Sequence, residues 1–494
     1  MAKFTIGSDM PEFGFFDDFF DGETLAISSH DSSIIFYEDA NGAQIILTGT
    51  DLTFSGNVVT GGEISNVWFV DENGGTLFAV SDGSFNAVSL ASTLNGDESI
   101  WEFVSFLSAG DDTIIGNSIG NDLNFGENHG NDTIIAGAGG SYIAGSKGDD
   151  LLKGGSGWDT LSYEDTFYRD DDTKGIKLDV EKGTVTDSWG DKDKISKFEE
   201  FRGSVYKDGM LGSKKADAFA GLDGADLLDG RGGLDEARYY LDDKYGGSAG
   251  ISVNLGQQKI IDGFGDADKV ISIERIFGTA HSDTFVGDKG DNHFIGLAGL
   301  DSFEGGKGFD VLEFYISDDM GQHGADVDLS LSSGQIKDDG FGNVEDANGF
   351  EAAGGGDEDD TIKLGTAKEG FAWGGGGDDI LTAGIAGNWL GGGIGSDTFV
   401  FLTTEAIGTL GKNKVQTFIF GFSQNQDDVI DLTALGDLTF IGDSAFSGSD
   451  GELRFHFKNG NTLLQGDMNG NGVADFTLEL GGKITLVSDD LLLV

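Results

Sequence analysis

Aspartate side chains recur at a nine-residue interval in a glycine-rich part of this chain, and carboxylates at a fixed interval are suited to binding hard cations. Residues 154–162 read GGSGWDTLS, and the preceding nine, 145–153, read GSKGDDLLK. In both, a glycine-rich turn leads to Asp at the sixth position and to an apolar residue at the eighth. Ca²⁺ accepts six to eight oxygen ligands in flexible geometry, whereas Mg²⁺ demands a stricter octahedron. The pattern therefore predicts calcium sites made of carboxylates and turn carbonyls.

The sixth-position residues of four blocks are the candidate calcium ligands. They are Asp112, Asp122, Asp132, Asp150 and Asp159 in the first block, Asp217, Asp226 and Asp235 in the second, Asp283, Asn292, Asp301 and Asp310 in the third, and Asp360, Asp379, Asn388 and Asp397 in the fourth. Ser141 and Glu369 replace the sixth-position Asp, and a site that uses Ser141 is expected to be weak or absent. The fourth block slips by one residue at Trp373, and Phe371 is predicted as one of its eighth-position core residues.

The repeat also predicts the elements that position these side chains. Residues six and eight lie two apart, so on an extended strand they share a face, and glycines at positions one, two and four allow the positive φ angles of tight turns. Two nonapeptides then make one coil of eighteen residues, with carboxylates of successive coils about 4.8 Å apart. Two carboxylates ~4 Å apart repel by about 4 kcal/mol at an effective dielectric constant of ~20. A cation between the coils reverses the sign of this interaction, while the eighth positions form a thin apolar core.

A longer repeat of about 75 residues overlies the short one. The connectors between blocks resemble each other, and Glu199, Glu274 and Glu351 occupy matching places in them. Their alternation of apolar and polar residues predicts short strands. We therefore predict an all-β chain of calcium-binding parallel β-roll or β-solenoid blocks with strand-rich connectors. The predicted parts are a β-rich region at 1–107, a repeat array at 108–400 with blocks at about 108–162, 212–238, 278–313 and 355–400, and a β-rich module at 401–494.

Composition excludes several classes of function. The chain has 87 acidic and 30 basic residues, a net charge of −57, so it repels nucleic acid and anionic membranes. It has no cysteine, which excludes disulfides and thiolate metal sites. The N-terminus lacks the basic start and apolar stretch of a cleaved signal peptide, and no apolar run approaches the ~18 residues of a transmembrane helix.

The in-phase repeats resemble those of the RTX (repeat-in-toxin) family of secreted bacterial proteins, and the resemblance covers about residues 108–494. Residues 415–435, VQTFIFGFSQNQDDVIDLTAL, and 466–482 resemble the terminal module of serralysin-type members. The resemblance implies an uncleaved C-terminal signal that a type I ABC exporter reads, and the final SDDLLLV has the acidic and then apolar character of such signals. The alternative is an ordinary terminal β-strand.

A second calcium candidate lies near the C-terminus. Asp467, Asn469, Asn471 and Asp475 have the spacing of an EF-hand loop through its ninth position. The twelfth position is Leu478, where a bidentate Glu is expected, and no flanking helices are predicted. The alternative is an Asx-rich β-turn.

No catalytic motif stands out. None of the six histidines forms the H-E-x-x-H pattern of zinc proteases. Gly246–Gly250 matches G-x-S-x-G, but a β connector follows it rather than the helix of a nucleophile elbow. In the N-terminal region, Trp68 and Trp101 belong to the core or, if exposed, bind glycans or another protein.

We therefore predict a non-enzymatic, secreted calcium-binding protein that folds outside the cell. Its expected role is structural, surface-associated or adhesive, with possible self-association or a matrix partner. The alternative is an extracellular hydrolase or polysaccharide-modifying enzyme carried on the repeat scaffold.

Overall fold

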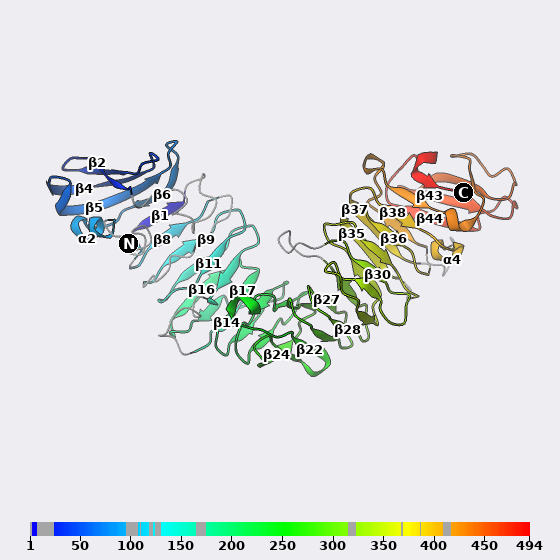
Figure 1. Ribbon diagram of the computed structural model, residues 1–494, viewed down its shortest axis with the longest axis horizontal. Coiled ribbons are helices and arrows are strands. Elements are labelled where there is room, and N and C mark those ends of the chain that lie inside the picture. The colour runs from blue at the N-terminus through cyan, green and yellow to red at the C-terminus, as the bar shows by residue number, and fades with distance from the viewer. Residues whose placement is uncertain are drawn as a thin grey trace. The chain divides into compact units, whose positions relative to one another are not determined.

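The computed structural model describes residues 2–6, 24–94, 107–108, 110–117, 122–123, 130–164, 174–314, 323–366, 369–385, 387–408 and 416–494. The chain divides into two compact units, residues 1–237 with 271–273, and residues 238–270 with 274–494. Each unit consists mainly of short parallel strands stacked in ladders (Figure 1), so the protein is an all-β parallel β-roll. The predicted functional division at residues 107 and 400 remains a prediction. Among the described residues, no helix is both long and apolar enough to span a bilayer.

Successive nonapeptides alternate between two sheets, so each strand pairs with the strand eighteen residues later. Ile143 lies beside Leu161 in one sheet, and Ile134 lies beside Leu152 in the other. All four are eighth-position residues and are at most 2% exposed. The two sheets therefore close on the thin apolar core that the repeat predicts.

Two sheets of coils form most of the first unit. One contains β8 (Thr113–Ile115), β10 (Thr133–Ile135), β12 (Leu151–Lys153), β16 (Lys192–Ser196), β15 (Thr184–Thr186), β14 (Lys177–Asp179), β18 (Gly209–Leu211) and β20 (Leu227–Asp229). The other contains β9 (Asp122–Leu123), β11 (Tyr142–Ala144), β13 (Thr160–Ser162), β17 (Glu200–Arg202), β19 (Ala218–Ala220) and β21 (Glu236–Arg238).

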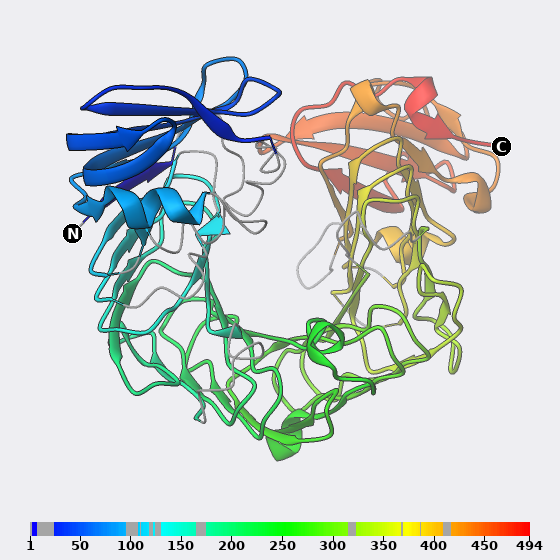
Figure 2. The same cartoon turned by 60° about the vertical axis from the view of Figure 1, so that its left-hand side comes forward.

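The N-terminal region is a sheet joined directly to the first coil. β1 (Lys3–Ile6) pairs antiparallel with β6 (Thr76–Ser81) and parallel with β8. The remaining members are β2 (Ala26–His30), β3 (Ile34–Glu38), β4 (Gln44–Ser55), β5 (Val58–Val70) and β7 (Phe85–Asn86). The two-turn helix α2 (Ala87–Thr93) packs against β5 (Figure 2), and the Asn86 side chain caps it by accepting the Ser89 N–H.

Each connector adds antiparallel strands to only one of the two sheets. In the first connector, β15 lies between β16 and β14, whereas β13 pairs directly with β17 in the other sheet. The second connector repeats this order with β24 (Ala267–Ile271), β23 (Lys259–Ile261) and β22 (Ser252–Asn254). The third has β32 (Asp346–Asn348), β31 (Ile336–Asp338) and β30 (Asp326–Asp328). The connectors therefore form the strands predicted for them.

The second unit continues the same design. Its first ladder adds β26 (Thr284–Val286) and β28 (Ser302–Glu304), and its second has β25 (Arg275–Phe277), β27 (His293–Ile295), β29 (Val311–Glu313), β33 (Ala352–Gly354), β35 (Phe371–Gly376), β37 (Trp389–Ile394) and β39 (Phe418–Phe420). A third has β34 (Thr361–Lys363), β36 (Ile380–Thr382), β38 (Thr398–Val400), β40 (Val429–Asp431) and β45 (Leu491–Leu492). In the core beneath β26 and β28, Phe285 and Phe303 stack with their ring centroids 4.8 Å apart, which is the spacing between neighbouring strands.

The C-terminal module ends the coils with antiparallel strands. These are β41 (Thr439–Phe440), β42 (Glu452–Lys458), β43 (Asn461–Asp467) and β44 (Phe476–Leu480), and β44 also pairs in parallel with β39. The short helices of the unit are α4 (Thr404–Ile407), η2 (Asp242–Tyr245), η3 (Leu255–Gln257), η4 (Gln424–Gln426), η5 (Thr433–Leu435) and η6 (Ser488–Asp490). The hydrophobic core runs without a break from the last coils into this module.

The register of the fourth block differs from the sequence prediction at one position. Ala372, not Phe371, is the inward residue that pairs with Ala353 and Leu390 and is fully buried. The additional residue of this block lies before Phe371 rather than at Trp373. A one-residue shift moves a strand's side chains to the opposite face, so Phe371 and Trp373 face outward together.

Candidate calcium sites in the carboxylate ladder

The described sixth-position carboxylates lie at the junctions of successive coils, and Asp159 shows the arrangement. Its Oδ1 accepts the main-chain N–H of Ser141, eighteen residues earlier, at 2.9 Å. Its Oδ2 accepts the N–H of Gly155 in its own turn at 2.7 Å. The side chain is fully buried. The carboxylate therefore joins its own turn to the preceding coil.

The contact between coils recurs through both units, and we call the set of residues that make it the carboxylate ladder. In each case the N–H of one sixth-position residue donates to Oδ1 of the sixth-position Asp in the next coil. The donor–acceptor distances are 2.7–3.1 Å for Asp112–Asp132, Asp132–Asp150, Asp208–Asp226, Asp217–Asp235, Asp283–Asp301, Asn292–Asp310, Asp360–Asp379 and Asp379–Asp397. The structure therefore brings the predicted candidates together as neighbours along the coils.

Several ladder carboxylates retain an oxygen that no protein group satisfies. Among the described residues, Oδ2 is buried without a hydrogen-bond partner in Asp112, Asp301, Asp310, Asp379 and Asp397. A buried carboxylate oxygen without a partner is costly, and a hard cation is the group that such an oxygen binds. No described group of three or more His, Cys, Asp or Glu side chains is arranged around a metal position. The ladder therefore fits Ca²⁺ that takes its remaining oxygens from turn carbonyls.

Burial makes the ladder unfavourable as a bare polyanion. Burial, together with the charges of neighbouring carboxylates, raises the pKa of Asp132 to about 7, that of Asp379 to about 8 and that of Asp301 to about 9. The main-chain N–H donors oppose these shifts but do not cancel them. Without metal, these carboxyls hold protons near neutral pH. Bound Ca²⁺ would supply the positive charge that lets them ionise.

The turns approach each other closely enough to require glycine. A Cβ on Gly155 would overlap the carbonyl oxygen of Gly137 in the preceding coil. Position four has a positive φ, for example +130° at Gly148 and +138° at Gly299. Position two has a positive φ in some other repeats, even where it is Leu222 or Leu297. Gly155, at position two of its repeat, therefore serves close packing, and glycine at position four serves backbone conformation.

The ladder includes acidic residues that the sequence analysis did not nominate. Asp193 and Glu345, from two connectors, accept the N–H groups of Asp150 and Asp301 at 3.0 and 2.7 Å. The other members of this kind are Glu199 for Asp159, Glu351 for Asp310, and Asp428 for Asp397. The matching places of Glu199 and Glu351 in the connectors are a sequence signal that identifies them. Asp208 is also a member of the ladder, and its position nine residues before Asp217 is the sequence signal that identifies it.

Three predicted ligands have a different environment. Asp122 has only its backbone in β9 among the described residues, so its side chain lies outside them. Asn292 uses Oδ1 to accept the Asp288 N–H at 2.9 Å. Asn388 is fully buried, and neither polar atom of its side chain has a hydrogen-bond partner in the described part of the chain.

The C-terminal loop candidate lies in a turn between the antiparallel strands β43 and β44. Asp467 accepts the N–H groups of Asn471 and Gly472 at 3.2 and 2.7 Å. Asp475 accepts from the Met468 N–H and, through both oxygens, from the Asn469 side chain. These bonds are those of an Asx-rich turn, and calcium binding by Asp467, Asn469, Asn471 and Asp475 remains a prediction.

Comparison with known families matches the repeats and the C-terminus separately. The family described as "RTX calcium-binding nonapeptide repeat (4 copies)" matches residues 137–165, 210–236 and 277–312. The family described as "Peptidase M10 serralysin C terminal" matches residues 342–493. No curated protein matches the chain.

Solved structures with some likeness include two subunits of the Azotobacter vinelandii mannuronan C5-epimerase. AlgE6R2 is 21% identical over 37% of this chain and 91% of its own, with a TM-score of 0.22, and AlgE6R3 is 18% identical over 43% and 78%, with a TM-score of 0.20. The extracellular lipase LipA from Serratia marcescens is 13% identical over 95% of this chain and 84% of its own, with a TM-score of 0.16. Likenesses this weak do not bear on function.

The family matches agree with the repeat, the ladder and the terminal module in identifying this chain. RTX nonapeptide repeats bind calcium ions, and the serralysin-type C-terminal region is that of proteins secreted by a type I exporter. The chain is therefore a secreted, calcium-binding β-roll protein that contains RTX nonapeptide repeats and a serralysin-type C-terminal region.

Proposed function

We propose that this protein is a structural or adhesive component outside the cell and that, at neutral pH, its β-rolls become stable only when calcium fills the carboxylate ladder. The observation that supports this proposal best is the set of buried Oδ2 atoms without partners, such as those of Asp301 and Asp379. In-register stacking repeats these oxygens along both units. Their ions would hold successive coils together, and the candidate residues at the sixth positions would be the ligands.

The calcium concentration outside the cell would drive folding there. Extracellular calcium modules have dissociation constants of roughly 10⁻⁴–10⁻³ M. A site at ~100 times its dissociation constant contributes about 2.7 kcal/mol if the unfolded chain does not bind. Many such sites would dominate the free energy of folding, so that metal binding and folding become one event. In the low calcium of the cytosol the chain would remain unfolded and competent for export.

Circular dichroism of the full chain during a calcium titration tests this proposal. We expect β content to appear cooperatively with Ca²⁺ and much less with Mg²⁺ at the same concentration. Equal β content in chelator and in calcium would contradict the proposal. Light scattering of the calcium-loaded protein then tests self-association, and a strictly monomeric protein would count against an assembling structural role.

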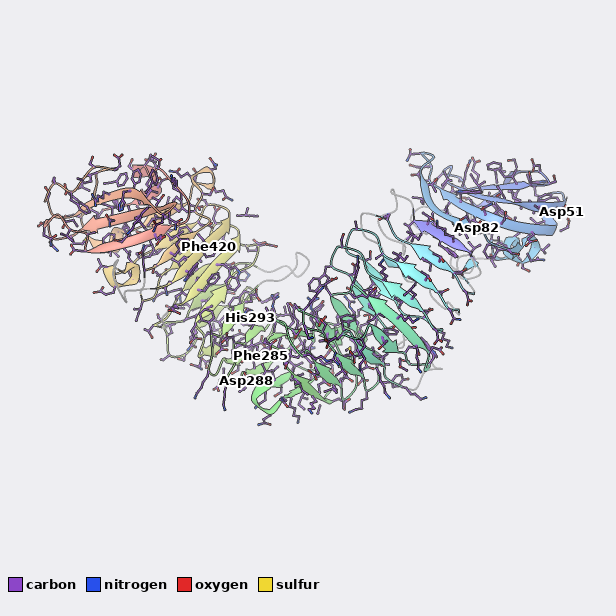
Figure 3. All side chains as sticks on the ribbon, turned by 180° about the vertical axis from the view of Figure 1, so that it is seen from behind. Asp51, Asp82, Phe285, Asp288, His293 and Phe420 are labelled. Carbon is purple, nitrogen blue, oxygen red and sulfur yellow. The ribbon has the colours of Figure 1, made fainter. Side chains whose placement is uncertain are left out.

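An aromatic cavity on the outer face of the second unit supports the adhesive role. The cavity has a volume of about 660 Å³ and is lined mainly by apolar atoms, with Phe371, Trp373 and Phe420 as its aromatic residues. The Phe371 ring centroid lies 5.2 Å from that of Trp373 and 5.5 Å from that of Phe420. Phe420 and His293, which both line the cavity, are labelled in Figure 3. Flat aromatic surfaces of this kind suit the apolar faces of sugar rings.

The same cavity is the observation that favours the enzymatic alternative. Asp291 and His293 also line it and provide a carboxylate and an imidazole, the groups used in general acid–base catalysis. A panel of polysaccharides incubated with the calcium-loaded protein separates the two roles. An adhesive protein binds a glycan, and Trp373→Ala weakens binding without any product forming. An enzyme releases product, and His293→Ala abolishes release more strongly than it weakens binding.

A further inference from the structure

The first two connectors contain an acidic loop of the same spacing outside the nonapeptides. Asp262, Asp266 and Asp268 in the second connector match Asp187, Asp191 and Asp193 in the first. Each loop closes a hairpin, between β23 and β24 or between β15 and β16. Oδ1 of Asp262 accepts the N–H groups of the next residues, Phe264, Gly265 and Asp266, at 3.0, 2.7 and 2.8 Å. The loop thus uses Oδ1 of Asp262 as a hydrogen-bond acceptor and leaves its Oδ2 without a hydrogen bond.

The second connector contains two buried carboxylate oxygens without partners. Oδ2 of Asp262 and Oδ1 of Asp242 have no hydrogen-bond partner among the described residues, and both side chains are 1% exposed. The two carboxylates are held around one peptide group, because Oδ2 of Asp242 accepts the N–H of Gly263 at 2.9 Å. A Cβ built on Gly263 would lie 3.1 Å from the carbonyl oxygen of Ala249, which adds a further oxygen nearby.

The surroundings of this pair are strongly negative. Asp268 is also 1% exposed and accepts the hydroxyl of Tyr239 at 2.8 Å. The carboxylates of Asp262 and Asp268 both lie close enough to Asp242 to interact with it electrostatically. The site therefore combines unsatisfied hard oxygens with an excess of negative charge, the combination that attracts a divalent cation.

We propose that Asp242 and Asp262 form a Ca²⁺ site of their own in the second connector. Their two unsatisfied oxygens are the carboxylate ligands, and the Ala249 carbonyl and water supply further oxygens. The first connector has a related site, where Oδ2 of Asp187 and the hydroxyl of Ser188 are buried without partners in the described structure. These connector sites lie outside the nonapeptide turns, so they would hold the inserted hairpins rather than the coils.

The third connector supplies a natural contrast. Asn343 occupies the place in this connector that Asp266 occupies in the second connector. Its side-chain amide donates to Oδ2 of Asp339 at 2.9 Å. Oδ1 of Asp339 caps its loop by accepting the N–H groups of Phe341 and Asn343. The protein's own amide therefore satisfies the oxygen that is left open in the other two connectors. The third connector is expected to bind no ion.

An exchange of these residues tests the site in the full chain. Equilibrium dialysis against Ca²⁺ measures the number of ions bound per chain in the wild type, in Asp266→Asn and in Asn343→Asp. We expect Asp266→Asn to lose one ion, because its amide reproduces the contact of Asn343, and Asn343→Asp to gain one. Asp266 is exposed, so its substitution leaves the packing intact, and circular dichroism confirms folding. Unchanged ion counts in both variants would overturn the proposal.

A second variant addresses the ligands directly. Asp242→Asn is expected to lose the same single ion and to show no additional loss when combined with Asp266→Asn, whereas the exposed neighbour Asp243→Asn loses none. An equal ion count in Asp242→Asn and in the wild type would show instead a carboxyl that remains protonated, and would overturn the site. Each result is a difference from the wild-type count, so it is distinguishable from failure of the carboxylate ladder, which would abolish binding throughout.

Discussion

At the residue scale, a ladder aspartate serves two purposes that conflict without metal. Its Oδ1 accepts a main-chain N–H from the preceding coil, as Asp379 does from Asp360 at 2.8 Å. The same carboxylate is fully buried, and its Oδ2 has no hydrogen-bond partner in the described structure. The hydrogen bond fixes the register of the coils, whereas the second oxygen makes their stability depend on a cation.

Asp379→Asn is expected to affect the two metal states in opposite directions. The amide oxygen still accepts the Asp360 N–H, so the calcium-free roll becomes more stable when a buried acid is removed. In calcium the variant loses a ligand, and loss of one site held at ~100 times its dissociation constant costs about 2.7 kcal/mol. Thermal unfolding with and without Ca²⁺ measures both effects. The exposed neighbour Asp378→Asn is the control, and equal calcium responses in the two variants would contradict a role for Asp379 as a ligand.

Gly155→Ala is expected to destabilise the roll even in saturating calcium. Its Cβ would overlap the Gly137 carbonyl oxygen, and the backbone shift that relieves this costs about 1–3 kcal/mol. Gly209→Ala is the matched control, because nothing lies within 4 Å of its Cβ and its φ is not positive. Chemical denaturation in calcium compares the two. A smaller loss for Gly155→Ala than for Gly209→Ala would show that the turns are not in close contact.

At the element scale, the ladder gives the stacked strands a pH dependence. The pKa of Asp132 is raised to about 7, that of Asp379 to about 8 and that of Asp301 to about 9, largely by burial. The unfolded chain releases these protons near pH 4. Because the folded state binds more protons, its stability is fully present below pH 4 and is lost as pH rises through the folded pKa values.

Calcium-free protein is therefore expected to be more β-structured and to melt at a higher temperature at pH 5 than at pH 9. Calcium-loaded protein is expected to show the reverse trend, because protons compete with the ion for the carboxylates. Circular dichroism melts at pH 5, 7 and 9, in calcium-free buffer and in millimolar Ca²⁺, test both trends. A calcium-free melting temperature that increases with pH would contradict the assignment of the buried carboxyls.

The sequence predicts the regular elements well because their period is imposed by backbone geometry. Residues eighteen apart pair in parallel, and eighth-position residues such as Leu161 and Phe285 are buried as expected. The position of Phe371 was wrong, because one inserted residue reverses the face of a strand and the glycine-rich sequence does not mark where it enters. The paired oxygens of Asp242 and Asp262 were missed for another reason: they meet only through the folding of η2 against the hairpin loop.

At the scale of the whole molecule, the effect of net charge on folding can be separated from the effect of specific calcium binding. The charge of −57 opposes compaction over distances that salt screens. The Debye length is about 10 Å at 0.1 M and 3 Å at 1 M ionic strength. Buried carboxylates are screened much less than exposed ones. Monovalent salt therefore weakens the repulsion between surface charges but not the repulsion within the carboxylate ladder.

We expect 1 M NaCl to contract the calcium-free chain without giving it the β spectrum that Ca²⁺ produces. Small-angle scattering reports the radius of gyration, and circular dichroism on the same samples reports the strands. The control is calcium at 0.15 M NaCl, which should both contract the chain and form strands. A full β spectrum in NaCl alone would mean that general screening, rather than occupied sites, folds the molecule.

The hydrogen bonds between coils also have a direction. The N–H of Asp112 donates to Asp132, that of Asp132 to Asp150, and that of Asp360 to Asp379, always toward the later coil. When a coil is added on the N-terminal side of a folded block, the carboxylate that accepts its N–H is already fixed in that block. A coil added on the C-terminal side must itself supply the accepting carboxylate. Growth of a block from its C-terminal end therefore has a template at every step, so we expect the coils to order from the last toward the first.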